Sequence, residues 1–181
     1  MIDFDTTKYI KITDDAKTKT SELIAQMKAK FPVWSYWDDK ELDNLFPSPK
    51  EPTTRHFHRE VESRDKGKSR NSMEGKPLIT LREYALAQMQ YYDETGKFLD
   101  KDGFTLLQDL LPVGWVAGGG YDPDGRGVLF DRDDAGDERG SYGFREAISL
   151  PSSLPSLPSD LEERVRMLEE WKSRVEKVIE I

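Results

Sequence analysis

The first hydrophobic pattern along the chain is that of a helix. Leu23, Ile24, Met27 and Phe31 recur at the spacing of one helical face. Pro32 follows directly, and the residue before a proline is disfavoured in the α conformation. We therefore predict an amphipathic helix that ends before Pro32.

A second helix is predicted to begin after Thr80. Thr80 and Glu83 form a capping box, in which the threonine hydroxyl accepts from the backbone three residues on and the glutamate reaches back. Gly96 supplies the left-handed residue that commonly ends a helix. Between these signals the apolar face consists of Leu81, Tyr84, Ala85, Met89 and Tyr92.

Runs rich in β-branched and aromatic side chains predict strands at residues 8–12 and 33–37, and an edge strand at residues 56–63. From residue 114 to residue 150, short apolar runs alternate with turns rich in glycine and aspartate. This pattern is typical of loop-rich β structure. Together with the helices it predicts an α+β fold, in which a region of short strands packs against helices.

Composition changes along the chain divide it into five segments. We predict an N-terminal α/β subregion at 1–63, a mobile polar loop at 64–78 and a central α+β region at 79–150. The Pro/Ser-rich stretch 151–158 predicts a semi-rigid hinge. An amphipathic helix is predicted at 159–181.

The predicted C-terminal helix carries a short heptad seam. Its apolar positions follow a 4-3 spacing, with Lys172 in the one polar position. Such a helix either docks on the body of the protein or pairs with copies of itself, and the sequence leaves both open. The seam consists of Leu161, Val165, Leu168, Val175 and Ile179.

Charge and composition narrow the classes of partner. The net charge is −8, so nucleic acid is not an expected partner, because binding a phosphate backbone needs a positive face. The chain has no cysteine, which excludes disulfides, thiolate metal sites and a cysteine nucleophile. It has no apolar run of the length of a signal peptide or a membrane span, so we expect a cytoplasmic protein without a membrane partner.

The two histidines of the chain form a candidate metal site. On a strand, His56 and His58 would project from the same face together with Glu60. Two histidines and a carboxylate can bind zinc or non-haem iron. The interpretation that we favour is a pair of solvent-exposed histidines, and a metal-dependent enzyme is the remote alternative.

A cluster of acidic residues is a candidate calcium site, because calcium prefers oxygen ligands. The spacing does not match an EF-hand loop, and arginines are interleaved with the acids. We favour hairpin loops with local ion pairs, with calcium as the alternative and no other cofactor expected. The candidate ligands are Asp122, Asp124, Asp131 and Asp133.

Residues 115–150 resemble the C-terminal part of C-type-lectin-like folds. The step Gly119-Gly120-Tyr121 and the closing run Tyr142-Gly143-Phe144-Arg145 are similar to those of the formylglycine-generating-enzyme-like branch, which includes the variable proteins of diversity-generating retroelements. The resemblance implies a compact domain whose long polar loops form a ligand-binding face. The oxidases of that branch need cysteines, so their activity is excluded here. The Glu-Pro-Asn and Gln-Pro-Asp motifs of calcium-dependent sugar binding are also absent.

No catalytic constellation stands out, so our hypothesis is a non-enzymatic module that binds a protein or a small ligand. Tyrosine, tryptophan and arginine dominate the energetics of many interfaces. The alternative is a structural or assembly protein of a phage or mobile element, which forms homo-oligomers through residues 159–181. The predicted contacts of the binding module are Trp115, Tyr121, Arg126, Arg132 and Tyr142.

Overall fold

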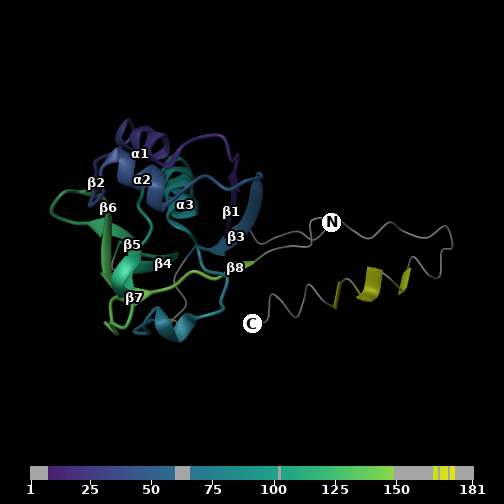
Figure 1. The fold of residues 1–181 in the computed structure, drawn as a ribbon. Coiled ribbons are helices and arrows are strands. Elements are labelled where there is room, and N and C mark those ends of the chain that lie inside the picture. The colour runs from purple at the N-terminus through teal and green to yellow at the C-terminus, as the bar shows by residue number, and fades with distance from the viewer. Residues whose placement is uncertain are drawn as a thin grey trace. The chain divides into compact units, whose positions relative to one another are not determined.

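The computed structural model describes residues 8–59, 66–101, 103–148, 165–166, 168–170 and 172–173. The chain divides into two units, Met1–Ala147 and Ile148–Ile181. The first unit contains helices and two β-sheets, so the predicted α+β fold is confirmed (Figure 1).

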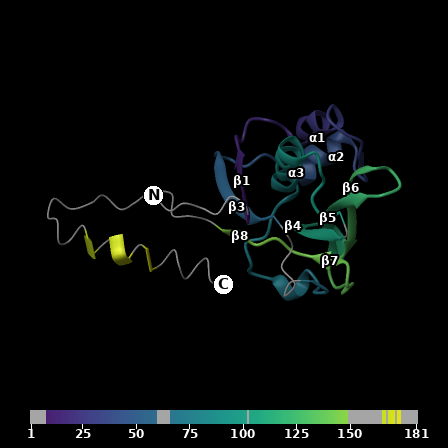
Figure 2. The same cartoon turned by 180° about the vertical axis from the view of Figure 1, so that it is seen from behind.

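Three α-helices lie together on one side of the first unit, as views from the front and from behind both show (Figure 1, Figure 2). They are α1 (Thr20–Lys28), α2 (Asp39–Leu45) and α3 (Leu81–Thr95). The signals that predicted α3 act as expected. The Thr80 hydroxyl accepts from the Glu83 amide, the Glu83 carboxylate accepts from the Thr80 amide, and Gly96 has a φ of 66°.

The smaller sheet has the strand order β1-β3-β8. It consists of β1 (Tyr9–Asp14), β3 (Thr53–His58) and β8 (Ala147–Ile148). β1 and β3 are antiparallel, with Tyr9 opposite His58 and Asp14 opposite Thr53. The prediction of an edge strand at 56–63 was wrong for residues 56–58, because β8 pairs with the other side of β3 and makes it the central strand.

The larger sheet has the order β2-β6-β5-β4-β7. β6 and β5 form a long antiparallel hairpin, and β2 pairs in parallel with β6, with Val33 opposite Val128. Residues from the predicted N-terminal and central regions therefore share one sheet. The strands are β2 (Val33–Ser35), β4 (Phe104–Leu110), β5 (Trp115–Asp122), β6 (Gly127–Asp134) and β7 (Tyr142–Gly143).

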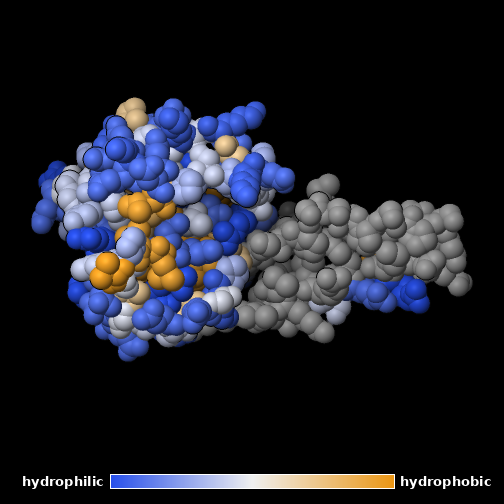
Figure 3. Space-filling view, in the orientation of Figure 1, coloured by the Kyte–Doolittle hydropathy of each residue, from blue (hydrophilic) through white to orange (hydrophobic). Residues whose placement is uncertain are grey.

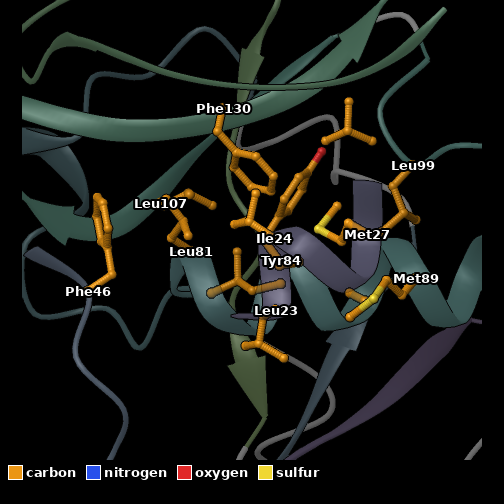
Figure 4. Close-up of a cluster of buried hydrophobic side chains, with 14 of the residues drawn as sticks. Leu23, Ile24, Met27, Phe46, Leu81, Tyr84, Met89, Leu99, Leu107 and Phe130 are labelled. Carbon is orange, nitrogen blue, oxygen red and sulfur yellow. The ribbon is translucent and has the colours of Figure 1, made fainter. Parts of the chain in front are cut away.

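The main core lies between the helices and both sheets, and Figure 4 shows its part between α1, α3 and the larger sheet. The Tyr84 ring meets the Phe130 ring edge-on, with 6.0 Å between the ring centroids. A Cβ atom on Gly119 would lie 2.5 Å from a ring carbon of Tyr84, so the glycine allows α3 to approach β5. Fully or almost fully buried members of this core are Leu23, Ile24, Met27, Phe46, Leu81, Tyr84, Met89, Leu99, Leu107 and Phe130.

A second apolar cluster involves residues 66–78, which we predicted to be part of a mobile loop. These residues are instead anchored. The buried side chain of Arg70 donates to the carbonyls of Leu107 and Gln108, both at 3.2 Å. Met73, in the short 3-10 helix η2 (Asn71–Met73), packs in the same cluster as Leu106 and Val116.

Of the second unit, the structure describes seven residues between 165 and 173, and all of them are helical, in agreement with the predicted helix. Val165 and Leu168 are exposed there. The predicted hinge at 151–158 lies outside the described residues, as do the remaining seam positions Leu161, Val175 and Ile179.

Candidate binding surface

An arginine on β6 lies between two aromatic rings. The guanidinium carbon of Arg132 is 4.4 Å from the ring centroid of Tyr36 and 4.6 Å from that of Trp115. Backbone pairing holds the three residues in place. Tyr36 donates its amide to the Phe130 carbonyl at 2.9 Å, and Trp115 is the first residue of β5, which pairs with β6.

Apolar surface continues around this stack. Trp34 is 50% exposed and Tyr36 45% exposed, with 6.5 Å between their ring centroids. Val113, in the 3-10 helix η3 (Pro112–Gly114) before Trp115, is 93% exposed. The hydropathy view shows orange aliphatic side chains gathered over the part of the body where β4 and β5 lie, whereas tryptophan, tyrosine and arginine are not orange on this scale (Figure 3). We call Trp34, Tyr36, Trp115 and Arg132 the aromatic–arginine surface.

The Arg132 guanidinium group can donate more hydrogen bonds than the described residues accept. A guanidinium group has five N–H donors, yet no acceptor among the described residues bonds to that of Arg132. The neighbouring acids on β6 are engaged elsewhere. Asp131 accepts from the backbone amide of Arg132 at 2.8 Å, and Asp133 accepts from the Tyr142 hydroxyl. A partner's carboxylate or carbonyl could therefore bind Arg132 without displacing an existing contact.

The other predicted contact residues lie apart from this stack. Tyr121 packs its ring on Phe98, with 5.2 Å between the centroids. Arg126 occupies the turn between β5 and β6 with a φ of 52°. Tyr142 is buried, with Arg139 over its ring. The structure thus brings together only two of the five predicted residues, Trp115 and Arg132.

Trp34 and Tyr36 were missed because the residues near them in the sequence do not show which of the aromatic side chains lie at the surface. Residues 33–37 formed an apolar and aromatic run that predicted a strand, and their neighbours across the sheet could not be identified. One signal was available: the run contains more large aromatic side chains than a short strand can bury. Trp37 is indeed buried against Phe46, which leaves Trp34 and Tyr36 exposed.

The candidate calcium ligands are divided between the two ends of the β5–β6 hairpin. Asp122 pairs with Gly127 and Asp131 with Gly118, so the two pairs of acids begin four positions, or about 13 Å of strand, apart along β6. Asp122 accepts from the Asp124 amide at 3.0 Å. Burial, the largest effect, raises the pKa of Asp133. Over the described ranges, no group of three or more histidine or acidic residues is arranged to hold a metal ion.

The candidate histidines differ from each other in their surroundings. His56 is buried, and burial lowers its pKa, with a smaller contribution from the charge of Lys11. The His58 ring packs at 4.4 Å from that of Tyr9. The expectation that both are solvent-exposed was therefore wrong for His56, because β3 is the central strand of its sheet.

A network of charged side chains surrounds the start of α3. Arg82 donates to both carboxylate oxygens of Asp14 at 2.8 Å, and this ion pair is buried. Arg55 donates to the Glu83 carboxylate at 3.0 Å. Asp109 accepts from the Leu81 amide, and burial, the largest effect, raises the pKa of Asp109 to about 6. These contacts join β1, β3 and β4 to α3.

Comparisons of the chain with protein-family models, curated proteins and solved structures found no match. Among the helices in the described ranges, none has the length and apolar character needed to cross a bilayer. The proposals below therefore rest on the geometry of the described residues.

Proposed function

We propose that the protein is a non-enzymatic binding module that recognises a protein partner through the aromatic–arginine surface. The observation that carries the proposal is the Arg132 side chain, held between the rings of Tyr36 and Trp115 with no acceptor from the described residues. Stacking restricts the guanidinium before binding, so less conformational entropy is lost when a partner arrives. Exposed tryptophan, tyrosine and arginine side chains are the residues that most often dominate protein interfaces.

The chemistry of the surface defines the partner. Arg132 can donate two parallel hydrogen bonds to one carboxylate. The exposed rings of Trp34 and Tyr36 can bury an apolar side chain next to that carboxylate. We therefore propose that the partner presents an acidic residue close to an apolar or aromatic one.

This proposal retains part of the sequence-based hypothesis. Trp115 and Arg132 remain as contacts, whereas Tyr121, Arg126 and Tyr142 are no longer assigned to the surface. The C-type-lectin-like resemblance of residues 115–150 remains a prediction. It agrees with a binding role, but the proposed contacts include β2, outside the region of resemblance.

Selection of peptides from a displayed random library would test the proposal directly, because the surface itself chooses the sequences that it binds. We expect the selected peptides to share an acidic residue next to an apolar one. Arg132→Ala should weaken their binding by about tenfold or more, since loss of an interface arginine often has such an effect. The measurement is the dissociation constant of each synthetic peptide.

Arg126→Ala is the matched control, because it removes the same charge from the turn of the same hairpin. It should change the affinity by less than about twofold, as expected for a residue outside the contact region. Peptides that bind both variants as tightly as the original protein would contradict the proposed surface. Circular dichroism of each variant would show that the fold is unchanged.

Self-association through the C-terminal helix is a second candidate function. Val165 and Leu168 lie in the described part of this helix, and both belong to the predicted heptad seam. A heptad seam can pair with a second helix that carries the same pattern. Light scattering should find an oligomer for the full chain and a monomer for residues 1–150, and two monomers would contradict this candidate.

A further inference from the structure

A cavity of about 340 Å³ lies between the end of α3, the start of β4 and the residues around β7. Its charged lining consists of four cationic side chains and one carboxylate, in a chain whose net charge is −8. The lining therefore has an excess of positive charge, which Lys66 and Lys101 carry, because Arg59 donates to Glu94 at 2.8 Å and Arg145 donates to Asp100. The charged residues are Arg59, Lys66, Lys101, Arg145 and Asp100.

Arg145 is the buried cation of this cavity. Its side chain is 2% exposed, and its Nη1 atom donates to the His58 carbonyl at 2.6 Å. Its Nη2 atom donates to the Asp100 carboxylate. The Nε atom of Arg145 is buried and has no hydrogen-bond partner among the described residues. Leaving a buried donor unsatisfied is unfavourable, so an acceptor supplied by a ligand would stabilise this site.

The carboxylate that holds Arg145 is itself fixed. Asp100 accepts from the Tyr84 hydroxyl at 2.9 Å and from the Thr105 hydroxyl at 2.6 Å. Burial and the nearby Asp100 charge raise the pKa of Tyr84 well above its usual value, so the tyrosine remains a neutral donor. Asp100 also has a φ of 54°, an uncommon conformation for a residue with a side chain. The position of Arg145 is therefore set before any ligand binds.

The remaining lining residues provide a charged rim and an aromatic wall. Lys66 and Lys101 are exposed and form no ion pair within the described part of the chain. The rings of Tyr91, Phe98 and Phe104 line the same cavity. An anion could bind the cations while a planar group packs against these rings.

We propose that this cavity binds a small phosphate monoester that carries a planar apolar group. A phosphate dianion matches a lining with an excess of positive charge, and its oxygens can accept from arginine and lysine together. The volume lies within the range of cavities that hold small organic ligands. This function is separate from peptide recognition at the aromatic–arginine surface.

Calorimetric titration of the full chain with phenyl phosphate at low salt would test the proposal. We expect saturable binding of one molecule per chain, tighter than binding of inorganic phosphate, because only the ester has a ring. Phenol should not bind, because it lacks the anion. If benzoate binds more tightly than phenyl phosphate, the proposed ligand class is wrong. Absence of saturation by phenyl phosphate at millimolar concentration would overturn the proposal.

The exposed lysines allow a test that does not disturb the buried network. The double change Lys66→Gln and Lys101→Gln should raise the dissociation constant of phenyl phosphate about tenfold, since two charge-assisted contacts are lost. Lys28→Gln with Lys40→Gln removes the same charge from α1 and α2, away from the cavity. Equal weakening by both pairs, or no weakening by the first, would contradict the assigned site. Arg132→Ala should leave this affinity unchanged.

Discussion

The carboxylate of Asp109 contributes a pH-dependent term to stability. It accepts from the Leu81 amide at 2.6 Å at the start of α3, and its pKa is raised to about 6 by burial, with a further rise from the charge of Glu83. The folded protein therefore binds a proton at Asp109 at a higher pH than the unfolded chain does. Proton binding at Asp109 therefore stabilises the fold. The stabilisation is complete below about pH 4 and is lost as the pH rises through about 6.

Asp109→Asn should consequently stabilise the protein at neutral pH. The amide oxygen can still accept from Leu81, but no charge is buried. We expect Asp109→Asn to raise the free energy of unfolding by about 1–2 kcal/mol more at pH 7 than at pH 4. Urea unfolding at the two pH values measures this difference.

Asp43 provides a control, because its replacement by asparagine should have the opposite effect on stability at pH 7. The Ser21 amide donates to its carboxylate at 2.9 Å, and this bond is the main reason why the pKa of Asp43 is lowered. Asp43→Asn should therefore lose stability at pH 7. A loss of stability in Asp109→Asn as well would show that the charge of Asp109 is favourable, contrary to our expectation.

Among the elements, the start of β6 depends on a glycine. A Cβ atom on Gly127 would lie 2.0 Å from the carbonyl oxygen of Pro32, which also accepts from the Val128 amide at 2.9 Å. The backbone segments before β2 and at the start of β6 are thus in direct contact. No side chain fits between them.

Gly127→Ala should separate these segments and destabilise the protein by about 2 kcal/mol, as overpacking commonly does. Thermal unfolding followed by circular dichroism would measure the loss. Gly140→Ala is the control, because a Cβ atom at Gly140 would meet nothing within 4 Å. If the two variants unfold at the same temperature, the close approach at Gly127 does not limit stability.

Elements whose ends are set by nearby residues could be predicted from the sequence, whereas pairings between distant residues could not. Thr80, Glu83 and Gly96 define the ends of α3 through contacts within a few residues, and the prediction was confirmed. The parallel pairing of β2 with β6 depends on how the whole unit packs, so no short pattern contains it. For the same reason, Trp115 and Arg132 could be selected as contact residues by type, whereas their neighbour Tyr36 could not.

For the whole molecule, the division into two units leads to a prediction about stability. All buried hydrophobic side chains of the described residues belong to the unit Met1–Ala147. A chain shortened to residues 1–150 should therefore melt within about 2 °C of the full chain, because the shortening removes none of this core. A fall of more than about 5 °C in the melting temperature would show that residues 151–181 contribute substantially to stability.

The parallel pairing of β2 with β6 also has a consequence for how the protein is made. Val33 leaves the ribosome long before its partner Val128 has been synthesised. Contacts between such distant residues slow folding, because a long loop must close before they form. Val33 of β2 and the apolar face of α1 thus remain uncovered during most of translation, when chaperones could bind them.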